Sequence, residues 1–189
     1  MVTWLELQAN GYFILSGRAE CTRRVEYEDP WLRVVRVGGE CVVDQPEGGG
    51  AVAWIECDGA VAVVEQYRVA LDRYMPELPR GFAMPGEDPA DCASREVREE
   101  TGIRIPPGDL VPLGVVHPDS GVLSSSVSAF RGVVRTGPVP GWRCDEVADV
   151  RMIPVDALIE RAARGGIADG ITLSVLGLVL ASGPVVAPR

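Results

Sequence analysis

The sequence predicts an α+β protein with additional β-strands at its N-terminus. Two observations favour this class: short apolar runs alternate with glycine-containing turns, and a strongly capped helix lies in the middle of the chain. With 189 residues, 47% of them hydrophobic, the chain is long enough to bury one core. We divide it at a glycine-rich stretch into an N-terminal strand extension, residues 1–45, and a main domain, residues 46–189.

Glycine and proline mark where the expected elements begin and end. The turn at Gly38-Gly39 separates a pair of strands, and Asp58-Gly59 is a dipeptide typical of two-residue hairpins. Outside the central helix we expect strands within residues 24–44, a hairpin over residues 51–68, strands over residues 111–116, 123–134 and 150–155, and helices over residues 155–165 and 169–182.

The central helix carries three carboxylates on one face. It begins after Asp88, an N-cap residue, and ends at Gly102. Glu96, Glu99 and Glu100 stand at positions i, i+3 and i+4, so they repel one another unless a cation lies among them. Mg²⁺ is usually held by a few carboxylates together with a substrate's phosphates. The alternative is a solvated helix face, but these glutamates border the apolar stripe, so we favour a metal site for phosphate chemistry.

The composition restricts the partners of the chain. A net charge of −9 argues against nucleic acid or an anionic membrane as the main partner. The apolar C-terminal segment is interrupted by glycines and a proline and is shorter than a transmembrane helix requires. The five cysteines show no paired spacing, which suits reduced thiols, so we expect a cytoplasmic protein without disulfides or zinc.

Residues 81–103, GFAMPGEDPADCASREVREETGI, resemble the signature of the Nudix hydrolases at every fixed position. That signature runs Gly, five residues, Glu, seven residues, Arg-Glu, an aliphatic residue, any residue, Glu-Glu, any residue, Gly and an aliphatic residue. The resemblance implies a mixed β-sheet between helices, an α/β/α sandwich. It also implies hydrolysis of a nucleoside diphosphate linked to another group, with Mg²⁺, or alternatively Mn²⁺, as the cofactor.

The resemblance also implies roles for individual residues. The expected metal ligands are the carboxylates of Glu96, Glu99, Glu100 and Glu87 and the main-chain carbonyl of Arg80. The expected catalytic residues are Arg95, Glu99 and Glu146. Arg95 should pair with a glutamate of the signature, for which we choose Glu87, and so hold that carboxylate in position. Gly81 should allow a backbone geometry that brings the carbonyl of Arg80 towards the metal.

Three short motifs outside the signature resemble the ADP-ribose and nucleotide-sugar pyrophosphatases. They are EQYR at 65–68, ELPRG at 77–81 and ADGITL at 168–173. We therefore expect ADP-ribose or another nucleotide sugar as the small-molecule substrate. Arg68 and Arg80 should help to bind it, although the alternative for Arg68 is a surface salt bridge. Met84 departs from the pattern, because many of these enzymes carry Glu there and a thioether does not ligate a hard metal.

A general base is still needed, and this branch usually carries it as a glutamate on a loop downstream of the signature. An acidic cluster precedes a strand there, and we choose Glu146, with Asp149 as the competitor. The alternative is that this cluster is only a solvated loop. The single histidine, His117, cannot form a zinc site alone; it either lines the substrate cleft or occupies a turn.

Several alternatives concern assembly and function. The resembled branch forms dimers through N-terminal strands, and the apolar residues of that segment favour a homodimer here; the alternative is that these strands pack on their own domain. Those apolar residues are Trp31, Leu32, Val34, Val35 and Val37.

Rival substrates are nucleoside triphosphates and dinucleoside polyphosphates. Hypotheses from other classes are a non-catalytic ligand-sensing module, which the intact signature disfavours, and an interaction protein whose acidic helix is a docking surface.

Overall fold

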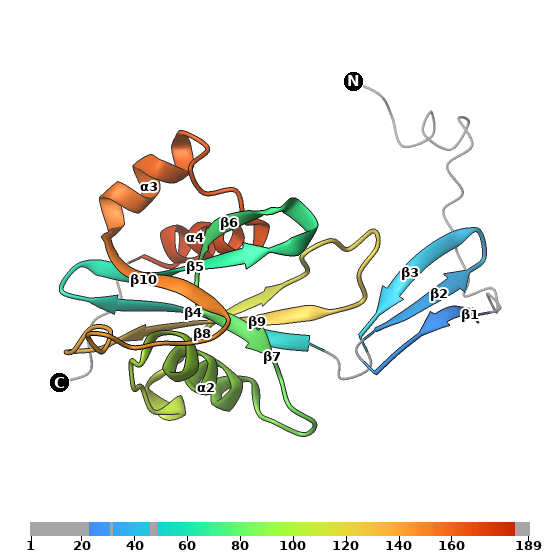
Figure 1. The fold of residues 1–189 in the computed structure, drawn as a ribbon, viewed down its shortest axis with the longest axis horizontal. Coiled ribbons are helices and arrows are strands. Elements are labelled where there is room, and N and C mark those ends of the chain that lie inside the picture. Colours follow the sequence, from blue (N-terminus) through green and yellow to red (C-terminus); the bar gives the residue numbers. More distant parts are fainter. Residues whose placement is uncertain (1–22, 31, 46–48, 184–189) are drawn as a thin grey trace.

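The computed structural model describes residues 23–30, 32–45 and 49–183, and every structural statement below concerns these residues. A seven-stranded mixed sheet lies between helices on both of its faces (Figure 1). A three-stranded antiparallel sheet from the N-terminal part stands beside it. The expected α+β class, with a mixed sheet between helices, is confirmed.

The strands are β1 (Arg23–Glu28), β2 (Arg33–Val37), β3 (Glu40–Asp44), β4 (Gly49–Cys57), β5 (Ala60–Arg68), β6 (Arg73–Glu77), β7 (Arg80–Phe82), β8 (Val111–Val116), β9 (Ser126–Val133) and β10 (Val147–Pro154). The helices are α2 (Pro89–Thr101), α3 (Val155–Ala163) and α4 (Gly170–Ser182), with short 3-10 turns η1 (Val69–Leu71) and η2 (Pro107–Asp109). Every predicted strand and helix is present. Two strands, β6 and β7, were not predicted, and the segment expected to form one strand before Gly38 is divided into β1 and β2.

The large sheet has the strand order β10-β5-β4-β9-β8, with β6 paired to β5 and β7 paired to β4. Strands β4 and β9 are parallel, whereas the other pairs are antiparallel. The β4–β5 hairpin turns at Asp58 and Gly59, which both have positive φ, 49° and 75°. This is the backbone geometry for which a two-residue Asp-Gly turn is preferred.

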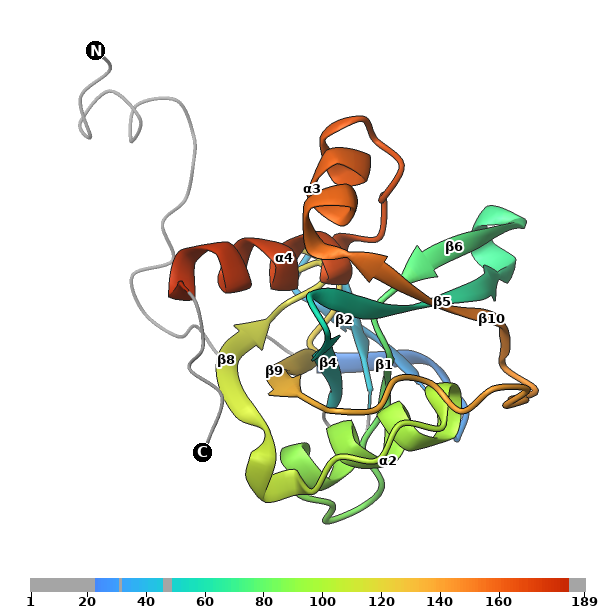
Figure 2. The same ribbon diagram turned by 90° about the vertical axis from the view of Figure 1, so that its left-hand side faces the viewer.

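Strand β4 is buried on both faces, and its side chains alternate between two cores. Val52 and Trp54 belong to the core that includes residues of α3 and α4. Ala51, Ala53 and Ile55 belong to the core on the other face, which includes residues of α2. Figure 2 shows these helices on opposite sides of the sheet. The two cores fix α2 against the sheet and thereby position the residues of the signature.

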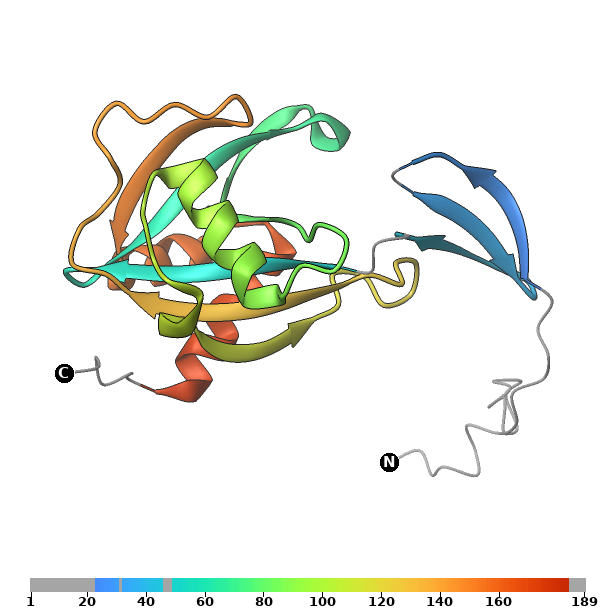
Figure 3. The same ribbon diagram turned by 90° about the horizontal axis from the view of Figure 1, so that it is seen from below.

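The N-terminal sheet joins the main domain at the end of β3. The main-chain N–H of Val43 donates to the carbonyl of Val122 at 2.7 Å, and the N–H of Ser124 donates to the carbonyl of Val43 at 3.0 Å. Figure 3 shows the three-stranded sheet to one side of the main domain. Val25 and Tyr27 of β1 are 49% and 55% exposed, so part of its apolar surface is uncovered.

The expectations about a membrane-spanning helix and about the cysteines can be compared with the structure. No helix in the described part of the chain is long and apolar enough to cross a membrane. The cysteines that the structure describes, Cys41, Cys57, Cys92 and Cys144, are free thiols. Cys21 and Trp31 lie outside the described residues.

Candidate active site

The ends of helix α2 follow the sequence closely. The side chain of Asp88 accepts a hydrogen bond from the N–H of Ala90 at 2.9 Å, and Pro89 occupies the first helical position. Gly102 ends the helix in the left-handed conformation, with φ 74°. These caps define the registry in which the glutamates face the sheet or the solvent.

The glutamates of α2 have different environments. Ala93 and Val97 are fully buried against the sheet, as the apolar stripe predicts. Glu96 and Glu100, beside that stripe, are only 8% and 2% exposed. The side chain of Glu99 is 45% exposed. Because two carboxylates are buried, the helix face is not simply solvated, and the hypothesis of a wet charged face fails for Glu96 and Glu100.

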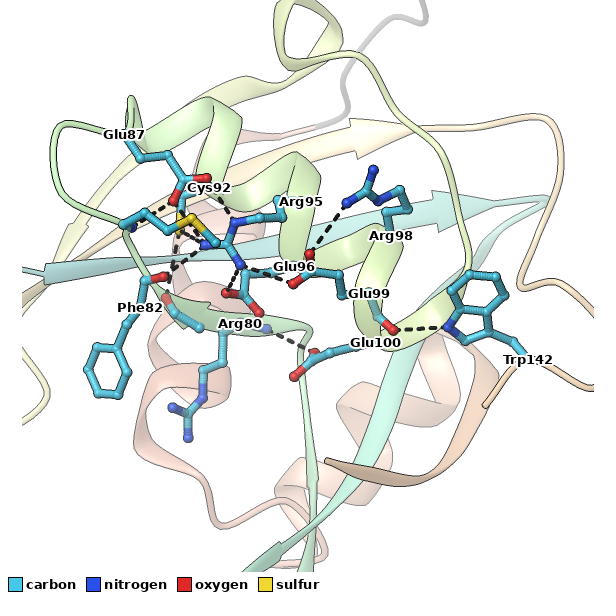
Figure 4. A network of polar contacts seen from close by, with 12 residues as sticks. Arg80, Phe82, Glu87, Cys92, Arg95, Glu96, Arg98, Glu99, Glu100 and Trp142 are labelled. Atoms are coloured by element: carbon cyan, nitrogen blue, oxygen red, sulfur yellow. Dashed lines mark hydrogen bonds and ion pairs between the residues drawn. The ribbon is translucent and has the colours of Figure 1, made fainter. Parts of the chain in front are cut away.

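Arg95 lies among the carboxylates and the loop before the helix (Figure 4). Its Nε and Nη2 donate to the two oxygens of Glu87 at 2.8 and 2.9 Å, as expected from the family resemblance. Its Nη1 donates to Glu96 at 2.6 Å and to Glu99 at 3.1 Å, and Nη2 also donates to the carbonyl of Phe82 at 2.8 Å. One guanidinium therefore holds three carboxylates and the signature loop.

Glu87 is a clamped carboxylate. Besides the two bonds from Arg95, its Oε2 accepts the main-chain N–H of Met84 at 2.8 Å. These bonds, the Arg95 bonds above all, lower the pKa of Glu87 to about 2. Glu87 is therefore ionised at neutral pH and already engaged, so its part in metal binding stays a prediction.

Glu100 is the most unusual carboxylate of the site. Its Oε2 accepts the main-chain N–H of Arg80 at 3.1 Å, whereas its buried Oε1 has no partner among the described residues. Burial, and then the charges of Glu96 and Glu146, raise the pKa of Glu100 to about 8. Burial also raises the pKa of Glu96. Two neighbouring buried carboxylates of this kind are stabilised only by protons or by a cation.

The reason for a glycine at position 81 differs from the one predicted. Its φ is not among the positive values of the described glycines, so special backbone freedom is not required. Instead, a Cβ at this position would lie 2.2 Å from the carboxyl carbon of Glu96. Glycine is needed because the carboxylate of Glu96 occupies the space of a side chain. Whether the carbonyl of Arg80 approaches a metal stays a prediction.

A cavity of about 280 Å³ lies in front of these groups. Its walls include Arg68, Arg80, Gly81, Phe82, Glu96 and Glu146. The structure thus brings the predicted base, Glu146, and both predicted substrate-binding arginines to one cavity with Glu96. Glu146 lies just before β10, and its charge raises the pKa of both Glu96 and Glu100.

Two other candidates from the sequence are not in the wall of this cavity. Asp149 is ion-paired with Arg151 at 2.7 Å, which lowers the pKa of its carboxyl group. The Nδ1 of His117 lies 3.3 Å from the carbonyl oxygen of Ser125. Asp149 instead lines a second cavity, of about 510 Å³, together with Glu100. Glu146 shares the first cavity with both arginines, and the ion pair with Arg151 engages Asp149, so we keep Glu146 as the first choice.

Trp142 anchors the loop that carries Glu146, a role that the sequence did not indicate. Its indole N–H donates to the carbonyl of Glu99 at 2.9 Å. Its ring covers Gly102, where a Cβ would lie only 2.8 Å from ring atom Cδ2. The loop is thus fixed to the C-terminal end of the helix that carries the glutamates.

Arg68 and Arg80 share one buried partner. Both donate to Glu77, which is 1% exposed, and the Nε of Arg68 lies 2.8 Å from its Oε1. The predicted alternative, a surface salt bridge at Arg68, is therefore half right, because an ion pair exists but its carboxylate is buried. Glu77 stands in the ELPRG motif, but its pairing with the two arginines was not predicted.

Buried polar side-chain atoms without a partner gather at this site. Within the described residues they are Oε1 of Gln66, Nε of Arg80 and Oε1 of Glu100. Gln66 and Arg80 line the same cavity. Since buried polar groups in folded proteins almost always have partners, such a cluster indicates where a ligand completes the hydrogen bonding.

The donor set fits a hard divalent cation in part. Glu96 and Glu100 offer buried carboxylate oxygens, and one of these oxygens has no partner. In the described residues no three His, Cys, Asp or Glu side chains are grouped to hold a metal ion. Arg95 instead engages Glu96 and Glu99. Glu100 offers an oxygen without a partner within the described residues, whereas one oxygen of Glu96 and one oxygen of Glu99 are each held by Arg95.

Comparison with known proteins identifies relatives of this chain. The chain is 32% identical over 126 residues to the CMP-5'-(N-acetyl-N-hydroxy-3-aminopropyl)phosphonate hydrolase of Streptomyces rubellomurinus, which covers 62% of this chain and 58% of that protein. It is 31% identical over 107 residues to the ADP-sugar pyrophosphatase of Mus musculus, which covers 53% and 48%. The chain thus spans about half to three fifths of the length of these relatives.

A solved structure shows the same fold. The crystal structure of an ADP compounds hydrolase superposes with a TM-score of 0.66 at 18% sequence identity, over 85% of this chain and 91% of that chain. The NUDIX domain matches residues 47–171, which is more than half of the chain and includes the whole signature. The chain therefore belongs to the NUDIX domain family.

Proposed function

We propose that the protein is a divalent-metal-dependent hydrolase of the diphosphate bond in a nucleoside diphosphate derivative, with ADP-ribose or another nucleotide sugar as substrate. The products are a nucleoside monophosphate and a sugar phosphate. The observation that carries the proposal is the cavity between the buried carboxylate of Glu96 and the arginines Arg68 and Arg80. The names of the two relatives, an ADP-sugar pyrophosphatase and a hydrolase of a CMP-linked phosphonate, support a nucleotide joined to a second group.

We assign the cofactor Mg²⁺, with Mn²⁺ as a substitute, to the carboxylates of α2. The assigned ligands are Glu96 and Glu100, with Glu99, Glu87 and the main-chain carbonyl of Arg80 as further ligands. When bound, the metal would neutralise charge on the diphosphate and activate the attacking water. The main-chain N–H of Arg80 orients the carboxylate of Glu100, and Arg95 orients that of Glu96.

We assign Glu146 as the general base. Glu146 lines the cavity, and its charge raises the pKa of both Glu96 and Glu100. It would accept the proton of the attacking water. The contact of Trp142 with the end of α2 holds the loop in reach of the cavity. Arg95 contributes by bridging the carboxylates of Glu96 and Glu99, whose repulsion its charge offsets.

Gln66 adds a polar group to the wall of the cavity. Its buried side-chain oxygen lacks a donor within the described residues. An amide can present either its oxygen to a sugar hydroxyl or its NH2 group to a phosphate oxygen, so it suits a ligand that carries both. Arg68 and Arg80, in the same wall, suit the phosphates.

We further propose that residues 1–45 are a dimerisation extension and that the protein is a cytoplasmic homodimer. The exposed Val25 and Tyr27 of the three-stranded sheet support a covering partner surface. Sedimentation should show twice the mass of the 20.2 kDa chain. A sedimenting species with the mass of a single chain would contradict the dimer and favour the alternative, in which the N-terminal strands pack only on their own domain.

A hydrolysis screen tests the proposed activity. Purified protein with Mg²⁺ should release AMP and ribose 5-phosphate from ADP-ribose, and should act on nucleotide sugars faster than on nucleoside triphosphates or dinucleoside polyphosphates. A preference for triphosphates would overturn the substrate class. Tight binding of the nucleotides without hydrolysis would instead support a ligand-sensing module, and failure to bind Mg²⁺ would support an interaction protein.

A further inference from the structure

Glu77, at the end of β6, lies between two arginines of the cavity wall. Arg68 donates to both of its carboxylate oxygens, through Nε to Oε1 at 2.8 Å and through Nη2 to Oε2. Arg80 donates through Nη2 to the same Oε2 at 2.6 Å. Two guanidinium groups that would otherwise repel each other are thus held side by side by one carboxylate that is only 1% exposed.

The arrangement leaves donors for a ligand. A guanidinium has five N–H donors in a fixed plane, and Glu77 uses two nitrogens of Arg68 and one of Arg80. The Nε of Arg80 is buried and has no partner within the described residues. Both arginines line the cavity that also contains Glu96. Unused donors in a fixed orientation suit the oxygens of a phosphate group.

The first turn of α4 supports the same arginine from behind. Asp169 lies 3.4 Å from the Nη2 of Arg80 and caps α4 by accepting the N–H of Thr172 at 2.8 Å. The hydroxyl of Thr172, a fully buried residue, donates to Asp169 and accepts the N–H of Leu78 at 3.0 Å. The helix cap therefore fixes both the arginine and the strand segment that follows Glu77.

We propose that Glu77 is a positioning residue, which holds Arg68 and Arg80 as a two-arginine receptor for a phosphate group of the substrate, and that Asp169 sets the position of Arg80 in this receptor. The inference rests on the proposed function, because it assumes a diphosphate-containing substrate. Glu77 touches neither the substrate nor the reacting atoms; it acts through the two guanidinium groups.

Binding to a substrate that cannot be cleaved tests this role without hydrolysis. The probe is ADP-ribose with its bridging oxygen replaced by a methylene group, titrated calorimetrically in Mg²⁺. Glu77→Gln keeps the shape of the side chain but removes its charge, so the Kd of the probe should rise by about 10- to 100-fold. In hydrolysis assays KM should rise by a similar factor while kcat falls less, because the metal ligands are untouched.

Glu56→Gln is the matched control, because Glu56 also joins an arginine, Arg131, to a second donor but lies outside the cavity wall. This variant should bind the probe as the unchanged protein does. If Glu77→Gln does not fold, Asp169→Asn replaces it. Asn caps helices about as well as Asp, so the fold should be kept while the Kd rises by about 3-fold.

The outcomes separate the two proposals. An unchanged or lower Kd in Glu77→Gln, or an equal rise in Glu56→Gln, would overturn the positioning role and leave the proposed function standing. If Glu77→Gln is unfolded, an unchanged Kd in Asp169→Asn would overturn it in the same way. If the unchanged protein does not bind the probe at all, ADP-ribose fails as the substrate and the proposed receptor fails with it.

Discussion

Two arginine–glutamate clusters lie at opposite ends of the parallel strands β4 and β9, and they differ in what they leave unpaired. One cluster lies towards the C-terminal ends of β4 and β9, which we call the far end because they are remote from the cavity. There Glu56 accepts hydrogen bonds from the Nε of Arg131 at 2.8 Å and from the indole N–H of Trp54 at 2.6 Å. The Nη1 of Arg131 donates to the carbonyl of Gly183 at 3.0 Å. Every nitrogen of this guanidinium has a partner, since Nη2 also lies 2.6 Å from Glu56.

At the cavity end, the cluster of Arg68, Glu77 and Arg80 is incomplete. It contains a buried Nε without a partner, within the described residues, and it opens on a cavity. Both clusters bury charge, so burial does not distinguish them. They differ in whether their buried polar atoms all have hydrogen-bond partners. A complete polar network stabilises the fold, whereas an incomplete one next to a cavity is arranged for a ligand. Changes at the cavity end should therefore affect activity, and changes at the far end stability.

The largest effect should follow from Glu146→Gln. The change removes the proposed base but leaves the carboxylates of α2 in place, so kcat should fall by about 10²- to 10⁴-fold with little change in Mg²⁺ affinity. Steady-state kinetics and a Mg²⁺ titration of both proteins measure the two effects.

Asp149→Asn is the control for this prediction, because Asp149 is ion-paired with Arg151 and is not in the wall of the cavity. It should keep kcat within about 2-fold, as is usual for exposed positions. The opposite result, with Asp149→Asn inactive and Glu146→Gln unaffected, would move the base to Asp149. If neither change matters, no separate base is needed.

A smaller loss of activity is expected for Gly81→Ala. The added methyl group would meet the carboxylate of Glu96 at 2.2 Å and push it out of place. We expect a loss of about 10- to 100-fold in Mg²⁺ affinity or activity, the range seen when the support of a metal ligand is disturbed. Gly108→Ala is the matched control, since a Cβ there meets no atom within 4 Å. Equal effects of the two variants would contradict the role of Gly81.

The third prediction concerns stability in the absence of metal. Burial raises the pKa of Glu100 to about 8 in the folded protein, above the ordinary value of 4.5 that applies to the unfolded chain. The folded state therefore binds this proton more tightly, so its contribution to stability is complete below about pH 4.5 and is lost as the pH rises towards about 8.

Glu100→Gln cannot titrate at this position. In chelator, its unfolding free energy should exceed that of the unchanged protein by roughly 1–3 kcal/mol at pH 8 and by much less near pH 5. Denaturant unfolding at the two pH values measures this difference. A gap that does not depend on pH would show that Glu100 is not a strained carboxylate.

The smallest effect is expected at the far end. Glu56→Gln keeps the hydrogen-bonding shape but removes the charge that faces Arg131, which is 8% exposed. We expect the unfolding free energy to fall by about 1 kcal/mol, with kcat unchanged. A loss of activity as large as the loss from the cavity residues would break the distinction between the two clusters.

The parts of the fold that sequence predicted are those defined by neighbouring residues. Asp58-Gly59 carries its own turn geometry, and Asp88 and Gly102 carry the ends of α2. Strands β6 and β7 were missed because they are short: β6 has five residues, with a proline, and β7 has three. β6 forms by pairing with β5, and β7 by pairing with β4. Such pairing depends on distant residues, so the local sequence pattern does not predict it.

The same limit explains the site. The signature predicted the glutamates of α2 and their partner Arg95, all within one segment. Arg80 and Asp169 are 89 residues apart in sequence, and Trp142 and Glu99 are 43 residues apart. Such contacts arise only when the sheet brings distant segments together. The space at Gly81 was missed for the same reason, because the occupying atoms belong to Glu96 on the helix.

The most direct test of the account is the Mg²⁺ dependence of ADP-ribose hydrolysis in three proteins: the unchanged chain, Glu100→Gln and Glu56→Gln. The central claim is that the buried carboxylates of α2 hold the metal. We predict that Glu56→Gln follows the unchanged protein across the titration, whereas Glu100→Gln loses at least about 100-fold in activity at every Mg²⁺ concentration. Full activity of Glu100→Gln with an unchanged Mg²⁺ dependence would contradict the claim.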